Sequence, residues 1–165
     1  MRMISLTFTT EMQDAIIARL TQLKDEIAQS ISSHGLTASG RTAASMYVNA
    51  TSSTVTLYGR PFFPALETGS KRWTGATGIR CTFQEFRQII SDWASAKGLH
   101  LGDASDTERA VSAIAMSIIR NGTAQTRRPR LDVYTSLVDK AAEDCGDLMV
   151  GIVNKEIDNA IAQWR

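Results

Sequence analysis

The stretch Thr10-Glu-Met-Gln-Asp-Ala-Ile-Ile-Ala-Arg-Leu-Thr-Gln-Leu-Lys-Asp-Glu-Ile-Ala-Gln-Ser-Ile31 decides the fold class. Its large apolar residues recur at intervals of three and four, which predicts a helix with one buried face. These residues are Met12, Ile16, Leu20, Leu23, Ile27 and Ile31. Thr10 and Gln13 have the spacing of a capping box, and Gly35 is suited to a left-handed stop. The chain therefore begins with a long amphipathic helix.

Two short segments after this helix are rich in β-branched and aromatic residues. Tyr47–Ala50 and Thr54–Tyr58 are separated by three small polar residues, which predicts a β-hairpin. A hairpin alone is marginally stable in water, so it must pack on a helix or gain a strand, for which residues 4–8 are a candidate. The small polar residues 37–46 before it predict a turn or a single helical turn.

The middle of the chain contains turn-forming residues. Pro61 and Pro64 predict an extended segment carrying Phe62 and Phe63. Three glycines then predict a long flexible loop over residues 68–80.

Three further helices are expected. The first begins near Thr82 and ends at Lys97-Gly98; Phe83, Phe86, Ile90 and Trp93 lie on one face of it. The second has a capping-box pair in Ser105 and Glu108, an apolar face from Val111 to Ile119, and an end at Asn121-Gly122. The third covers residues 131–165, where Gly146 and Gly151 indicate that something packs closely against the helix. We therefore expect a single α+β domain over residues 1–165, with about four helices around a small antiparallel sheet.

Charge and composition exclude several classes of protein. The formal net charge of +1 gives no global attraction to nucleic acid or to an anionic membrane. Two cysteines cannot make a disulfide scaffold, no apolar stretch is long enough to span a bilayer, and Glu11 and Asp14 interrupt any signal-peptide core. We expect a soluble protein made inside the cell.

Charge is nevertheless divided unevenly along the chain. Residues 60–130 carry eleven basic and six acidic side chains, a net charge of +5, whereas residues 131–165 carry three basic and seven acidic side chains, a net charge of −4. The two segments either solvate different faces or complement each other across copies of the chain. Both alternatives stay open.

Few residues offer chemistry. His34 and His100 are expected in solvent-facing loops beside glycines, and Cys81 and Cys145 lack the spacing of a metal site. We therefore expect no enzyme activity, no metal and no cofactor. A small enzyme that brings His100 and Cys81 together by folding remains an alternative.

The strongest charge cluster is Arg127-Arg128-Pro129-Arg130. It either contacts nucleic-acid phosphates, or faces water or the acidic helix of a partner. Large aromatic residues also occur among turn formers, where they either cover the domain's own core or anchor another subunit. The candidate interface residues are Phe62, Phe63, Arg72, Trp73, Arg127, Arg128, Arg130 and Trp164.

Four short motifs follow one another in a characteristic order. They are a small-residue turn with Gly40-Arg41, the segment Phe62-Phe-Pro-Ala-Leu-Glu67-Thr-Gly69, a helix end with Trp93 and Lys97-Gly98, and a helix end with Gly122-Thr123. In this order, over roughly residues 10–125, the chain resembles the neck or tail-completion proteins of long-tailed bacteriophages, also described as minor tail or head–tail joining proteins.

This resemblance implies a structural protein of the virion, made in the bacterial cytoplasm. Such proteins form a ring, six-fold in the expected case, between head-closure or connector proteins and the tail terminator or tube. DNA passes through the channel without sequence-specific binding, and no membrane is involved. The alternative is a nucleic-acid-associated protein that contacts DNA through the arginines of residues 120–130.

Overall fold

In the computed structural model the described residues are 10–37, 39–60, 63–70 and 82–162. They divide into two compact units. The first comprises the described parts of Met1–Gly35, Thr42–Arg60 and Val133–Arg165, and the second those of Leu36–Arg41 and Pro61–Asp132. That the whole chain behaves as one domain stays a prediction.

The α+β class is confirmed, but the expected number of helices is wrong. The described residues form six α-helices and one two-stranded antiparallel sheet. The two helices that the sequence did not resolve are short: α2 covers Arg41–Ala44, in the segment expected to be a turn or one helical turn, and α3 covers Pro64–Thr68.

Helix α1, Thr10–Ser33, supplies the core of the first unit. The expected apolar stripe is confirmed at Met12, Leu23, Ile27 and Ile31, which are all buried, while Ile16 and Leu20 are half-buried. Gly35 has φ +66°, as expected of a left-handed stop.

The predicted hairpin is also confirmed. Strands β1, Tyr47–Ala50, and β2, Val55–Tyr58, pair antiparallel, with Tyr47 opposite Tyr58. These two rings stack with centroids 5.2 Å apart. The hairpin packs on α1, and the Gln13 side-chain amide, expected in a capping box, donates to the Thr51 carbonyl at 2.8 Å. The candidate third strand, residues 4–8, lies outside the described residues.

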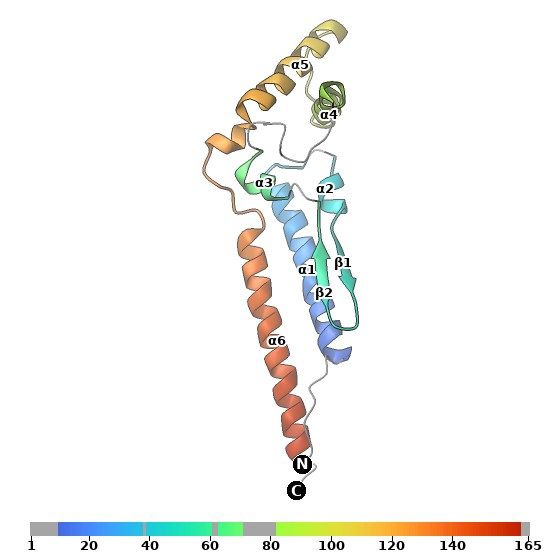
Figure 1. The fold of residues 1–165 in the computed structure, drawn as a ribbon, viewed down its shortest axis with the longest axis vertical. Helices are drawn as coiled ribbons and strands as arrows, with labels where there is room; N and C mark the ends of the chain where they lie inside the picture. Colours follow the sequence, from blue (N-terminus) through green and yellow to red (C-terminus); the bar gives the residue numbers. More distant parts are fainter. Residues whose placement is uncertain (1–9, 38, 61–62, 71–81, 163–165) are drawn as a thin grey trace. The chain divides into compact units, whose positions relative to one another are not determined.

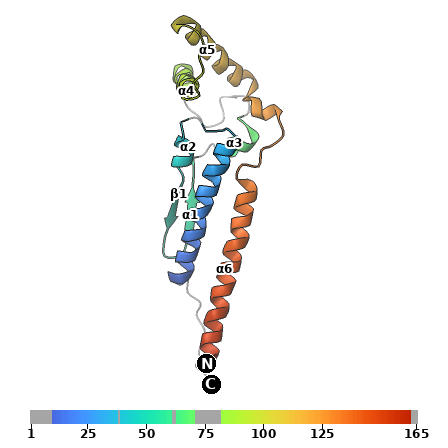
Figure 2. The ribbon, with the colours of Figure 1, turned by 180° about the vertical axis from the view of Figure 1, so that it is seen from behind.

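Helix α6, Thr135–Ala162, runs antiparallel to α1, and α1 lies between α6 and the hairpin (Figure 1, Figure 2). Two ion pairs fix this arrangement. Arg19 Nε donates to Asp144 Oδ2 at 2.7 Å, and Lys155 Nζ donates to Glu11 Oε1 at 2.9 Å. The first residue of α6, Thr135, lies four residues after the predicted start at residue 131.

The described residues supply no close neighbour for Gly146 or Gly151. A Cβ atom built on either glycine meets no described atom within 4 Å. Among the described residues these glycines therefore weaken α6 without permitting a close approach.

The core of the second unit forms between α4, Phe83–Ala96, and α5, Ala104–Asn121. It consists of Ile90, Val111 and Ala115, with Phe86, Leu101, Ile114 and Ile118 packed against them. Thr82 caps α4 with Glu85 in a capping box, and Gly98 follows its end with φ +66°. The start and end of this helix are as predicted.

The predicted apolar face of α4 is buried only in part. Ile90 and Ala94 are buried, whereas Phe83 and Trp93 are each 40% exposed.

The predicted cap of α5 is wrong. Helix α5 is capped by Asp103 and not by Ser105, because the Asp103 carboxylate accepts the backbone N–H groups of both Ser105 and Asp106.

The segment around Phe63 is helical and not extended. Phe63 has φ −48° and ψ −43°, and Pro64 occupies the first turn of α3. Proline is favoured at that position because its missing N–H needs no partner there and its φ already suits a helix. The expected loop over residues 68–80 lies mostly outside the described residues. None of the described helices combines the length and apolar character that a bilayer crossing requires.

Candidate functional site

Among the described residues of the second unit, the buried charged group is Glu67, at the end of α3. Its side chain has no solvent exposure. Two guanidinium nitrogens of Arg130 donate to Glu67 Oε2, Nε at 2.9 Å and Nη2 at a shorter distance. The Glu67 carbonyl accepts the Leu131 N–H at 3.1 Å and the Gln125 side-chain amide at 3.3 Å. A buried carboxylate is stable only when such partners offset its loss of hydration.

Gly69, two residues further on, lies against the short helix η1, Ala124–Arg127. A Cβ at Gly69 would lie 2.6 Å from Thr126 N and 2.7 Å from Thr123 Oγ1. Its φ of +74° is also one that side-chain-bearing residues rarely adopt. Only glycine fits this position without displacing the backbone of η1.

Thr123 joins the same region by two reciprocal hydrogen bonds. Ser70 N–H donates to Thr123 Oγ1 at 2.9 Å, and Thr123 N–H donates to the Ser70 carbonyl at 2.9 Å. Gly122, with φ +76°, ends α5 and turns the chain into this contact. We call Glu67, Gly69, Thr123 and Arg130 together the Glu67 junction.

The structure thus explains part of the motif set that the sequence singled out. It brings Glu67, Gly69, Gly122 and Thr123 together from two segments more than 50 residues apart. Trp93, Lys97 and Gly98 lie at the end of α4, outside these contacts. Gly40 has φ +71°, and Arg41 Nε donates to Ser39 Oγ at 3.1 Å. No described contact joins Gly40 or Arg41 to the Glu67 junction.

The candidate interface residues fall into three groups. Arg127 and Arg128 are exposed, and neither guanidinium has an ion-pair partner in the described part of the chain. Arg130 instead belongs to the Glu67 junction, and Phe63 is half-buried at the start of α3. Phe62, Arg72, Trp73 and Trp164 lie outside the described residues. The pairing of Glu67 with Arg130 was missed, because nothing in the sequence links two residues 63 positions apart.

A second surface that the sequence did not reveal lies on α6. Val150, Ile157 and Ile161 are 59%, 40% and 54% exposed. Their spacing of seven and four residues places them on one side of the helix, opposite buried Ala141. We call these three residues the α6 stripe. The spacing of these three residues is visible in the sequence. It was missed because apolar residues also occur on the inner side of the helix, so the sequence did not distinguish the two sides.

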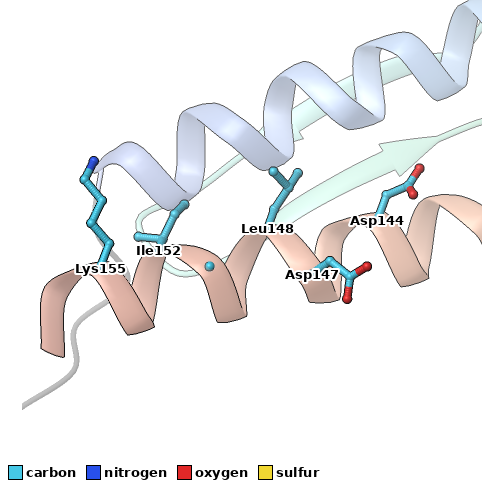
Figure 3. A pocket seen from close by; sticks show the side chains of 6 residues that line it. Asp144, Asp147, Leu148, Ile152 and Lys155 are labelled. Carbon is cyan, nitrogen blue, oxygen red and sulfur yellow. The ribbon is translucent and has the colours of Figure 1, made fainter. Parts of the chain in front are cut away.

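The same helix lines an open groove of about 570 Å³, which we call the α6 groove. Figure 3 shows Leu148, Ile152 and Lys155 on the side of α6 that faces α1, and Asp147 directed away from that side. Its lining residues are Asp144, Asp147, Leu148, Gly151, Ile152 and Lys155.

Titratable groups do not converge on a reaction centre in the described residues. His34 and His100 are exposed, as expected. Burial raises the pKa of the Cys145 thiol, against the opposing effect of Arg19, so little reactive thiolate forms at neutral pH. Among the residues that the structure describes, no three potential metal ligands lie together. Cys81 lies outside them.

Among the described residues, Arg19 is the other buried charged group. Burial lowers its pKa, but the hydrogen bond to Asp144 and the charges of Glu26 and Asp144 outweigh burial and raise the pKa above its ordinary value. Arg19 therefore stays charged and serves to hold α6 on α1.

No protein-family model, curated protein or solved structure matches this chain.

Proposed function

We propose that this chain is a structural, non-enzymatic protein of the phage head–tail junction that assembles with copies of itself into a ring. The observation that carries the proposal is the α6 stripe. Helix α6 already packs one side on α1, yet it presents Val150, Ile157 and Ile161 to solvent on the other side. A helix that is apolar on opposite sides is typically buried on both, so a second protein surface is expected there.

The Glu67 junction supports a scaffolding role. Its buried ion pair, its reciprocal backbone contacts and the tight approach at Gly69 hold α3 and η1 in one arrangement. Glu67, Gly69 and Thr123 belong to the motifs that resemble the neck and tail-completion proteins, and Arg130 lies outside those motifs. They act here as internal supports and leave the arginines next to them, Arg127 and Arg128, on the surface.

A ring of identical copies needs two different complementary patches, because each copy contacts one neighbour through each patch. The α6 stripe is one patch. The exposed apolar residues of α4 and its surroundings, Ile89, Trp93 and Leu99, offer another in the second unit. Cohesion would come from apolar burial on the order of 1,000 Å² or more, and surface ion pairs would set register. The proposed ring has six copies, lies between head-closure or connector proteins and the tail terminator or tube, and surrounds the DNA channel.

Negative-stain microscopy of the purified protein, and of virions labelled on this subunit, tests the proposal. We expect rings, and label at the head–tail junction. The double variant Val150→Asp/Ile157→Asp should abolish the rings while its helical circular dichroism stays at the wild-type level. Thr21→Asp, which adds a charge to the exposed outer face of α1, is the matched control and should form rings. A wild-type protein that stays monomeric, with virions that carry no label, would contradict the proposal.

A second candidate function is supported by the exposure of Arg127 and Arg128, which suits contact with DNA phosphates. Binding of the isolated monomer to duplex DNA should then weaken steeply with salt and be lost in Arg127→Ala/Arg128→Ala. DNA binding that this double variant retains would count against this alternative.

A further inference from the structure

The lining of the α6 groove is apolar and has a gap at Gly151, which has no side chain. Leu148 and Ile152 supply apolar side chains one turn apart, and Gly151 supplies none. No described atom lies within 4 Å of the place where a Cβ of Gly151 would be. An inserted side chain would therefore lie against Leu148 and Ile152 without displacing a described group.

The polar groups at the edge of the groove differ in how they are used. Asp144 accepts a hydrogen bond from Arg19 at 2.7 Å, and Lys155 donates to Glu11 at 2.9 Å. Asp147 makes no hydrogen bond or ion pair with any described residue, and it is exposed. The groove thus combines apolar lining side chains with one carboxylate, Asp147, that can accept hydrogen bonds from an incoming group.

This combination fits an arginine side chain. Its apolar stem can cover Leu148, Gly151 and Ile152 while its planar guanidinium reaches a carboxylate at the edge. A purely apolar side chain would leave Asp147 without a partner, and an acidic one would be repelled by it.

The chain itself carries arginines suited to this groove. Arg127 and Arg128 are exposed and have no ion-pair partner in the described part of the chain. They belong to the segment 60–130 with net charge +5, whereas α6 lies in the segment with net charge −4. Two α6 grooves facing each other would instead bring like charges together.

We infer that the α6 groove of one copy receives Arg127 or Arg128 of a neighbouring copy, with the guanidinium on Asp147 and the stem over Gly151. This inference rests on the proposed ring, since it names one of the head-to-tail contacts that such a ring requires. The ion pair fixes register, while the α6 stripe contributes apolar burial.

Two exposed positions of α6 provide the matched test. Gly151→Met fills the groove, whereas Ala142→Met adds the same side chain at an exposed position outside both the groove lining and the α6 stripe. Sedimentation velocity over a range of concentrations should show association weakened about tenfold or more in Gly151→Met, and close to wild type in Ala142→Met.

Charge reversal tests the ion pair independently of the shape of the groove. Asp147→Lys should weaken association about tenfold, and Arg127→Glu/Arg128→Glu combined with Asp147→Lys should recover most of the loss. Circular dichroism confirms that each variant folds, and Asp147 is exposed, so its replacement does not disturb the core.

The outcomes separate the two proposals. Wild-type assembly that is equally strong in Gly151→Met and Asp147→Lys would overturn the groove contact and leave the ring standing. A wild-type chain that remains monomeric would overturn both. Loss of assembly in Asp147→Lys that the arginine reversal does not restore would overturn the contact with Arg127 or Arg128 and show that Asp147 meets another part of the neighbouring copy.

Discussion

The two long helices of the first unit use their outer faces in opposite ways. On α1 the side opposite the core carries exposed small or polar residues such as Asp14, Thr21 and Asp25. On α6 the side opposite Ala141 carries the α6 stripe. Packing among the described residues buries the apolar side of α1 and leaves the α6 stripe exposed. The contrast teaches that α1 serves the core of this unit, and it is the reason why we propose α6 as the surface for a partner.

The largest expected effect breaks the inner face of α1. Ile27 is 3% exposed, so Ile27→Ala should lower the free energy of unfolding by about 2–5 kcal/mol. Ile157→Ala, on the α6 stripe, should change it by less than about 1 kcal/mol in the monomer. Urea titrations at a low protein concentration measure both. Equal losses would show that the stripe belongs to the monomer's core.

The next effect concerns the second unit, where a buried group depends on an exposed one. Arg130→Ala would leave the Glu67 carboxylate buried without its guanidinium and should cost about 2–3 kcal/mol. Arg128→Ala is the control. It removes an exposed arginine without a described ion pair and should stay within about 0.5 kcal/mol of wild type. Thermal melts of the two variants would argue against the Glu67 junction if they coincided.

A smaller effect, of opposite sign, is expected along α6. Gly146→Ala and Gly151→Ala should each stabilise the protein by about 0.5–1 kcal/mol, because both positions have open space and a helical glycine is costly. Gly69→Ala should destabilise it, since its Cβ would meet Thr126 N at 2.6 Å. Chemical denaturation measures all three. If Gly146→Ala or Gly151→Ala destabilised the protein instead, another group would have to pack closely against α6 at that position.

The smallest effect depends on pH and concerns the caps of α4 and α5. The backbone N–H of Thr82, followed by its hydroxyl, holds the pKa of Glu85 below its ordinary value, and the backbone N–H groups of Asp106 and Ser105 do the same for Asp103. A lowered pKa in the folded state means stabilisation that is complete above the ordinary carboxyl pKa and is lost as pH falls below about 4. Helical circular dichroism between pH 6 and 2 should show this loss. The double variant Glu85→Gln/Asp103→Asn should reduce this pH dependence. A pH dependence equal to that of the wild type would show that these two caps do not cause it.

Local patterns in the sequence predicted most of the fold. The stripe of α1, the hairpin, the Thr82 cap and the stop at Gly122 each depend on residues close together in the chain. The helical conformation at Phe63 was missed because two competing tendencies of Pro64 apply there, and its preference for a first helical turn prevailed.

The candidate site was predicted less well, for two physical reasons. The Glu67–Arg130 pair joins residues 63 positions apart, so no local pattern reports it. The roles of Gly146 and Gly151 depend on what lies next to them. A glycine within a helical sequence is equally compatible with a closely packed neighbour and with open space, so the sequence does not distinguish the two. Phe62, Arg72, Trp73 and Trp164 stay predictions as interface residues.

Hydroxyl-radical footprinting across a range of protein concentrations tests the central claim most directly. As concentration rises, the account predicts falling modification of Val150, Ile157 and Ile161, while the exposed tyrosines Tyr47 and Tyr58 of the hairpin stay equally reactive. A stripe that remains fully reactive at the concentrations where rings form would contradict the claim that α6 joins the copies together.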